Sequence, residues 1–251
     1  MAEIIKEKEE IQEFLKNLGI EYRFSCYSEK NPEGCQLLAD YLTQIDSDYV
    51  KANKVLKENC DERNYGRSCS SYGMNLLNGR GKCLFKRLNL LLMLLSGFPK
   101  RHRDFTAALK YFIKACELND ATGCDFAGKI LAGFEPPLQK YIPPEFEKGL
   151  RYLERGCNLG SSGQLFESTE SCYAAAFMHA SGVKEFLPRN DEKAIEFGTK
   201  ACDSSHMDSC KLVSIVYKRC NNEEMAEKFM AKYERLKKQI TENVGIEMQR
   251  T

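Results

Sequence analysis

Residues 193–214 read KAIEFGTKACDSSHMDSCKLVS, and the pattern in this stretch recurs along the chain. A segment with helical spacing of its apolar residues ends at Cys202, and a second such segment begins beside Cys210 after a short polar link. Closing cysteines of this kind are Cys60, Cys116, Cys157 and Cys202, and opening cysteines are Cys35, Cys69, Cys124, Cys172 and Cys210. The chain therefore contains several copies of one helical unit.

Small residues stand at two fixed distances from these cysteines. Eight residues before the closing cysteine are Ala52, Ala108, Gly149 and Ala194, and four residues after the opening cysteine are Ala39, Gly73, Gly128, Ala176 and Ser214. Larger residues recur at offsets of five and seven, and such offsets keep residues on one face of an α-helix. A small residue at a fixed place on that face lets two helices approach closely, so these positions are predicted helix–helix contacts.

The distance between copies indicates how the units are arranged. Cys26 and Cys60 are 34 residues apart, as are Cys35 and Cys69, and Cys116 and Cys157 are 41 apart. Repeats of this length are typical of stacked helical hairpins, because one hairpin cannot bury its own apolar face. The sequence therefore predicts an all-α fold, an α/α solenoid of about five helix–turn–helix repeats.

The alignment of the repeats on their cysteines, which we call the register, divides the chain into three regions. Residues 1–34 are expected to form an amino-terminal half-repeat cap, with an amphipathic helix over 9–18. Residues 35–220 form the repeat array, and the Glu/Lys-rich residues 221–251 form a carboxyl-terminal capping helix with a polar outer face.

Three segments depart from the repeat pattern: insertions near 83–100 and 162–168, and a proline-bounded loop over 134–146. The first insertion carries an apolar run much shorter than the roughly 20 residues that span a bilayer. It is either a helix that docks on a membrane surface or a partner, or an insertion that packs on the solenoid or is poorly ordered. The second of these interpretations is favoured.

Small residues at fixed helix positions, an aromatic-rich second helix ending Lys-Ala-Cys and a glycine-containing turn resemble Sel-1-like repeats. The paired cysteines at the repeat junctions are similar to those of the cysteine-rich branch of that family. The resemblance covers residues 8–235 apart from the insertions, and is most evident over 13–35 and 54–60. That branch includes both assembly factors of the mitochondrial intermembrane space and secreted bacterial proteins.

Twelve cysteines are too many for a typical cytosolic protein of this length without a metal. No two are closer than eight residues, and the histidines are scattered, so no zinc-type spacing occurs. The register predicts five disulfides: Cys26–Cys35, Cys60–Cys69, Cys116–Cys124, Cys157–Cys172 and Cys202–Cys210. Cys83 and Cys220 remain as free thiols. Buried free thiols throughout are the alternative.

The sequence gives little support to an enzyme. Some cysteine-rich members of the family have been grouped with β-lactamases, but only Ser181 and Lys184 match a Ser-x-x-Lys element, without the supporting motifs. No Cys-x-x-Cys motif is present for thiol–disulfide chemistry or haem attachment. His179 or His206 could ligate a haem non-covalently, although packing is the favoured role of each, and no cofactor is expected.

The balance of 37 basic and 36 acidic residues gives no reason to expect nucleic acid as a partner. The acidic amino terminus lacks the features of a signal or transit peptide, yet the cysteines favour an oxidising compartment. The intermembrane space resolves this conflict, and a cytosolic protein with reduced cysteines is the alternative.

The resemblance implies import by the oxidative machinery of that space and a binding function in assembly of respiratory chain complexes, chiefly cytochrome c oxidase. The expected protein is a monomeric scaffold without a membrane span. Two alternatives stay open: a thiol–disulfide or haem-handling assembly enzyme, and a cysteine-rich scaffold of another compartment.

Overall fold

The computed structural model describes residues 2–80, 103–162 and 165–248, and side chains within 8–80, 103–160 and 168–242. These residues form eleven α-helices and two short 3-10 helices, and the described ranges contain no strand beyond the isolated bridge between Val183 and Leu187. The chain divides into two compact units, Met1–Leu118 and Asn119–Thr251. The prediction of an all-α repeat solenoid is confirmed, and each unit is described by itself.

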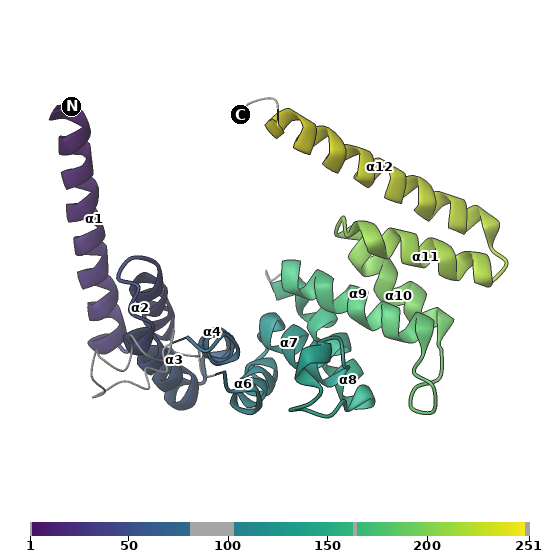
Figure 1. Ribbon diagram of the computed structural model, residues 1–251, viewed down its shortest axis with the longest axis horizontal. Coiled ribbons are helices and arrows are strands. Elements are labelled where there is room, and N and C mark those ends of the chain that lie inside the picture. The colour runs from purple at the N-terminus through teal and green to yellow at the C-terminus, as the bar shows by residue number, and fades with distance from the viewer. Residues whose placement is uncertain (1, 81–102, 163–164, 249–251) are drawn as a thin grey trace, which may run out of the picture. The chain divides into compact units, whose positions relative to one another are not determined.

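The first unit contains α1 (Ala2–Tyr27), α2 (Pro32–Gln44), α3 (Tyr49–Arg63), α4 (Gly66–Leu77) and α6 (Phe105–Glu117). Each of these helices packs against the next one along the chain, as Figure 1 shows. The helices α2 and α3 form one hairpin, and α4 and α6 form the next. The insertion expected near 83–100, between α4 and α6, lies outside the described residues.

The second unit contains α7 (Ala121–Leu131), α8 (Phe146–Asn158), α9 (Leu165–Ser181), α10 (Asp191–Asp203), α11 (Met207–Arg219) and α12 (Glu223–Met248). The 3-10 helices Pro136–Leu138 and Leu159–Ser162 lie in its loops. Neighbours in sequence pack together, and α9 also contacts α7 and α11, which are the first helices of the adjacent hairpins (Figure 1). The first helices of three successive repeats are therefore neighbours in this unit.

Short polar side chains mark where most of these helices begin. Asp104 and Asp120 each accept a hydrogen bond from the backbone N–H three residues further on, at 3.0 and 2.9 Å. Asn190 does the same at the start of α10, and His206 at the start of α11. Such caps satisfy backbone donors that have no partner within the helix, so the helix boundaries are encoded locally.

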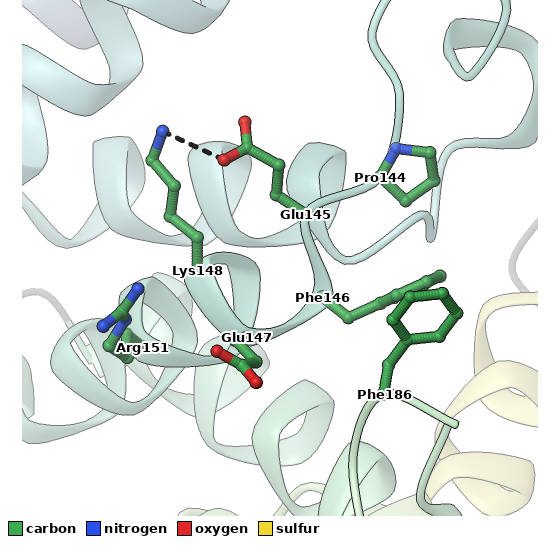
Figure 2. Close-up of a pocket in the computed structure, with 7 residues that line it drawn as sticks. All are labelled: Pro144, Glu145, Phe146, Glu147, Lys148, Arg151 and Phe186. Carbon is green, nitrogen blue, oxygen red and sulfur yellow. Dashed lines mark ion pairs between the residues drawn. The ribbon is translucent and has the colours of Figure 1, made fainter. Parts of the chain in front are cut away.

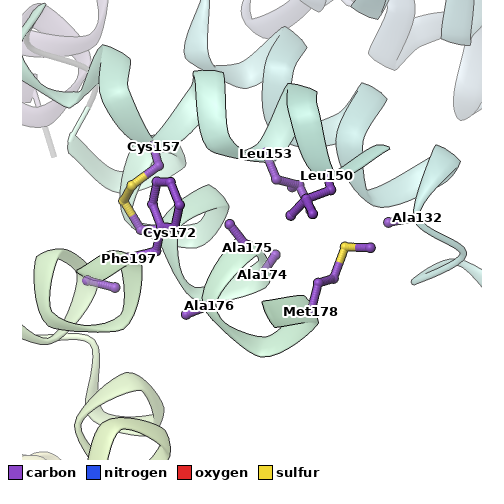
Figure 3. Close-up of a cluster of buried hydrophobic side chains, with 11 residues drawn as sticks. Ala132, Leu150, Leu153, Cys157, Cys172, Ala174, Ala175, Ala176, Met178 and Phe197 are labelled. Atoms are coloured by element: carbon purple, nitrogen blue, oxygen red, sulfur yellow. A yellow bond between two sulfur atoms is a disulfide. The ribbon is translucent and has the colours of Figure 1, made fainter. Parts of the chain in front are cut away.

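The core of the second unit surrounds the junction of α8, α9 and α10. Leu153 and Ala175 are fully buried there, and Phe197 of α10 belongs to the same buried cluster as the disulfide of Cys157 and Cys172 (Figure 3). Three consecutive alanines on α9 let its neighbours approach closely, because their side chains add little volume.

A carboxylate links the second helices of consecutive repeats in the first unit. Asp61, next to Cys60 on α3, accepts hydrogen bonds from Lys57 at 2.6 Å, Lys114 at 3.0 Å and Tyr111 at 3.1 Å. Burial alone would raise the pKa of Asp61, but these three donors outweigh it and lower the pKa to about 2. The carboxylate is thus held ionised between α3 and α6.

Two elements differ in length from the repeat pattern. The predicted first helix over 9–18 is too short, because α1 continues through Cys26 to Tyr27. The helix α9 begins seven residues before Cys172, whereas α2, α4, α7 and α11 begin three residues before their cysteines. Part of the predicted insertion at 162–168 therefore lengthens α9 by about one turn.

The capping helix expected over 221–251 corresponds to α12, which contacts α11. The proline-bounded loop over 134–146 includes the 3-10 helix Pro136–Leu138. Within the part of the chain that the structure describes, no helix is long and apolar enough to cross a membrane.

Candidate functional site

The repeat junctions bring predicted cysteine pairs together. Disulfides join Cys26 to Cys35, Cys60 to Cys69, Cys157 to Cys172 and Cys202 to Cys210. Their Cα atoms lie between 4.3 and 4.8 Å apart, close to the range that a bridge requires. Cys116 and Cys124 are each disulfide-bonded as well. All ten of these side chains are buried, with at most 5% of their surface exposed.

The nine small residues named from the register are all buried at helix contacts. Gly128 of α7 faces Leu153 of α8, and a Cβ atom at Gly128 would lie 2.6 Å from Leu153 Cγ. Gly149 of α8 lies against the end of α7, where a Cβ atom would be 2.5 Å from the backbone nitrogen of Ala132. Ser214 donates a hydrogen bond to the carbonyl of Ala226 at 2.7 Å and joins α11 to α12.

Of the two predicted free thiols, only Cys220 lies in the described part of the chain. It is exposed and free at the end of α11, and its sulfur is 3.7 Å from a carboxylate oxygen of Asp191. Arg219 binds the same carboxylate. Cys83 falls outside the described residues.

The two candidate haem ligands both contact protein groups. His179 is buried; its Nε2 atom is 2.8 Å from Glu154, and its ring stacks parallel to Phe197. His206 caps α11, because its Nδ1 accepts the N–H of Ser209 at 3.2 Å. Its Nε2 lies 3.4 Å from a carboxylate oxygen of Glu170. Among the described residues, no group of three or more His, Cys, Asp or Glu side chains could hold a metal ion.

A shallow, open cavity of about 330 Å³ lies at the start of α8. Figure 2 shows the rings of Phe146 and Phe186 on one side, 5.3 Å apart, and the ion pair between Glu145 and Lys148 on the other. The register did not point to this cavity, because Phe186 comes from the turn before α10 and holds no repeated position. Its polar lining carries both signs of charge, so it has no marked preference for a charged ligand.

A row of aromatic rings runs across α9. We call Phe134, Phe177, Tyr173 and His206 the ring row, because successive ring centroids are 6.0, 6.5 and 4.5 Å apart. Phe134 follows α7, Tyr173 and Phe177 are one turn apart on α9, and His206 precedes α11. The row thus connects three successive repeats of the second unit, and the register alone did not single it out.

Charged groups border the ring row on α7 and α9. Lys129 pairs with Asp125 at 2.9 Å and with Glu170 at 3.3 Å. Burial raises the pKa of Asp125, opposed by the ammonium group of Lys129 and a hydrogen bond from Ser171. The only ammonium group in this network is therefore already shared by two carboxylates.

Comparison with known proteins identifies the repeats. The Sel1 repeat model matches residues 92–120, 138–161 and 169–206. The chain is 31% identical to a protein of Drosophila melanogaster named cytochrome c oxidase assembly factor 7 homolog, over 97% of this chain and 94% of that protein. It is also 31% identical to cytochrome c oxidase assembly factor 7 of Xenopus tropicalis, over 81% of this chain and 92% of that protein.

A human protein with the same name is 29% identical, over 72% of this chain and 68% of that protein. Among solved structures, a Sel1 repeat protein from Oxalobacter formigenes superposes with a TM-score of 0.60 at 14% identity, covering 90% of this chain and 83% of that one. That likeness concerns the fold alone. Because the Drosophila protein is related over nearly the whole of both chains, this chain belongs to the cytochrome c oxidase assembly factor 7 family of Sel1 repeat proteins.

Proposed function

We propose that this chain is a non-catalytic scaffold that assists the assembly of cytochrome c oxidase. The observation that carries the proposal is the relationship over nearly the whole chain to a protein named for that role. The repeat fold supports it, because stacked helical repeats present extended surfaces to protein partners. On this proposal the partners are proteins of respiratory complex assembly, and the chain acts as a monomer.

The burial of the disulfides favours a scaffold over a thiol–disulfide enzyme. Exchange requires a thiolate to reach a disulfide sulfur, and the bridged cysteines are at most 5% exposed. The disulfide between Cys202 and Cys210 joins α10 to α11, a position in which it stabilises the junction of two repeats. We therefore propose that all five predicted bridges are structural.

The compartment is part of the same proposal. An assembly factor for cytochrome c oxidase acts in mitochondria, and disulfides persist where the surroundings are oxidising. The intermembrane space meets both conditions, and import by its oxidative machinery would leave the bridges formed.

Loss of the gene tests the proposed function. We expect lower cytochrome c oxidase activity and less assembled complex on native gels, both restored by the wild-type chain. Unchanged oxidase in cells that lack the protein would contradict the proposal.

Thiol counting separates a scaffold from a redox enzyme. Alkylation of the native protein without reductant is expected to label only Cys83 and Cys220, and all 12 cysteines react after reduction and unfolding. A further pair that is readily reduced in the folded protein would favour the enzyme instead.

A further inference from the structure

The ring row exposes aromatic surface that the fold does not cover. Phe177 is 41% exposed and Phe134 is 37% exposed, although their rings contact each other. Tyr173 is half-buried, and within the described ranges no residue forms a hydrogen bond with its hydroxyl group. Neighbouring exposed rings make this surface a candidate interaction site, because large apolar patches that a fold leaves uncovered mark such sites.

The carboxylates beside the ring row give this surface a negative charge. Glu170 lies one turn before Tyr173 on α9, and Asp208 is an exposed residue in the first turn of α11. Burial raises the pKa of the Tyr173 hydroxyl, and the negative charges of Asp208 and Glu170 raise it further. Both carboxylates therefore act on the face of the ring row.

Few positive charges offset the negative charges of Glu170 and Asp208. Lys129 is shared between Asp125 and Glu170, and Lys211 lies over the ring of Tyr233 on α12 at 5.7 Å. No described residue forms an ion pair with Asp208. A positively charged group that approaches the ring row thus finds both aromatic faces and an unpaired carboxylate.

We propose that the ring row docks a protein segment that carries an arginine next to an apolar residue. The guanidinium group would lie over the ring faces of Tyr173 and Phe177, within reach of Asp208. An arginine fits better than a lysine, because its planar group stacks on rings and forms paired hydrogen bonds. The apolar neighbour would cover Phe134. This inference rests on the proposed function and deepens it, by naming the kind of partner segment that the scaffold holds.

Two short peptides test the inference directly. One is a fluorescein-labelled nonapeptide in which two Leu-Arg pairs are separated by glycines, and its twin has glutamate in place of each arginine. Fluorescence anisotropy with the full chain at low salt is expected to show binding of the arginine peptide alone, weakened by added salt. Equal binding of the two peptides, or binding of neither, would overturn the inference.

Single substitutions locate the binding surface. Phe177→Ser is expected to weaken binding of the arginine peptide about tenfold, from the loss of a stacking face, and Asp208→Asn about threefold, from the loss of an exposed charge. Phe186→Ser is the matched control, because that phenylalanine is 60% exposed and lies outside the ring row. Circular dichroism confirms that each variant is folded. A loss from Phe186→Ser as large as that from Phe177→Ser would refute the ring row as the site.

The same variants separate this inference from the proposed function. In cells that lack the gene, Phe177→Ser is expected to restore oxidase poorly and Phe186→Ser fully. If the wild-type chain restores oxidase but does not bind the arginine peptide, the docking inference falls and the proposed function stands. If the peptide binds with the expected pattern but loss of the gene leaves oxidase unchanged, the docking surface stands and the proposed function falls.

Discussion

One added methyl group at the contact between α7 and α8 tests the predicted helix packing. Gly149→Ala adds one methyl group, which would lie 2.5 Å from the nitrogen of Ala132, 2.9 Å from its Cα and 2.9 Å from the carbonyl carbon of Leu131. All three neighbours are backbone atoms, so no side-chain rotation can relieve the overlap. The helices have to separate by several tenths of an ångström or more.

The size of the effect follows from two opposing contributions. Alanine in an uncrowded helix interior is about 1 kcal/mol more favourable than glycine, whereas overpacking of a tight interior costs about 1–3 kcal/mol and sometimes more. Because rigid backbone opposes the new methyl group, the cost lies at the upper end of that range. We therefore expect Gly149→Ala to lower the free energy of unfolding by about 2 kcal/mol.

Two other glycines provide a graded comparison. The three atoms nearest to a Cβ atom at Gly19 all belong to the side chain of Tyr41, the first at 2.7 Å, and that half-buried side chain can move, so Gly19→Ala is expected to be close to neutral. Gly128→Leu places a whole side chain against Leu153, which is fully buried. It is expected to be at least as destabilising as Gly149→Ala.

Thermal unfolding and hydrogen exchange provide the measurement. For a chain of this size about 2 kcal/mol corresponds to a melting temperature lower by roughly 4–8 °C. Repeat arrays lose stability locally, so the amide protons of α7 and α8 are expected to exchange faster before other helices change. If the Gly149→Ala variant melts at or above the wild-type temperature, or loses no more stability than the Gly19→Ala variant, the predicted contact is wrong.

Three further predictions concern the bridges, the caps and pH. Cys202→Ser is expected to cost about 2.5–3 kcal/mol from loss of a short closed loop, whereas Cys220→Ser leaves stability unchanged; equal effects in denaturant unfolding contradict the proposed pairing. His206→Ala removes the cap of α11 and is expected to cost about 1 kcal/mol, largely restored by His206→Asn, and an unchanged melting temperature for the alanine variant argues against the cap. Because the folded pKa of Asp61 is about 2 and its unfolded value is near 3.9, its stabilising contribution is complete above about pH 4 and is lost as pH falls toward 2. Asp61→Asn is therefore expected to flatten the dependence of stability on pH in that window, and a profile identical to that of the wild type is the contrary result.

The helical hairpins were predictable because residues at the same position in each repeat make the same helix–helix contact. A small residue at a fixed offset is required where two helices touch, and Ala52, Ala108 and Ala194 are each fully buried in the structure. The same reasoning placed Cys202 beside Cys210. Both features depend on spacing along the chain, which can be read from the sequence even when contacts between distant segments are unknown.

The length of α1 was not predictable in the same way. Its second half has apolar residues on two opposite faces: Tyr22 and Cys26 face the core, whereas Ile20 and Phe24 are exposed. A single apolar stripe is the usual signal of an amphipathic helix, and two stripes obscure it. Gly19 obscures it further, because its reason for being glycine is the ring of Tyr41 on another helix.

The start of α9 shows a second limit of local reasoning. The segment 162–168 stretches the separation of Cys157 and Cys172 to 15 residues, whereas the other pairs are eight or nine apart, so the sequence indicated an insertion in the link. The structure instead begins α9 at Leu165, and Ser168 donates a hydrogen bond to the carbonyl of Cys157 at 2.8 Å. That bond joins the extra turn to the end of α8, a contact between segments that helix periodicity cannot report.

The repeat register does contain a signal for the ring row. This signal lies outside the positions at which the repeats keep small residues. Tyr173 and Phe177 stand one and five residues after their opening cysteine, and the same two positions on α7 hold Asp125 and Lys129. On α11 they hold Lys211 and Ile215. The small residues keep their size from copy to copy because a neighbouring helix limits it, whereas these two positions change in charge, size and polarity. Positions whose chemistry differs from copy to copy are the ones at which a repeat can acquire recognition without losing its fold, and a search for binding residues in such an array should begin there.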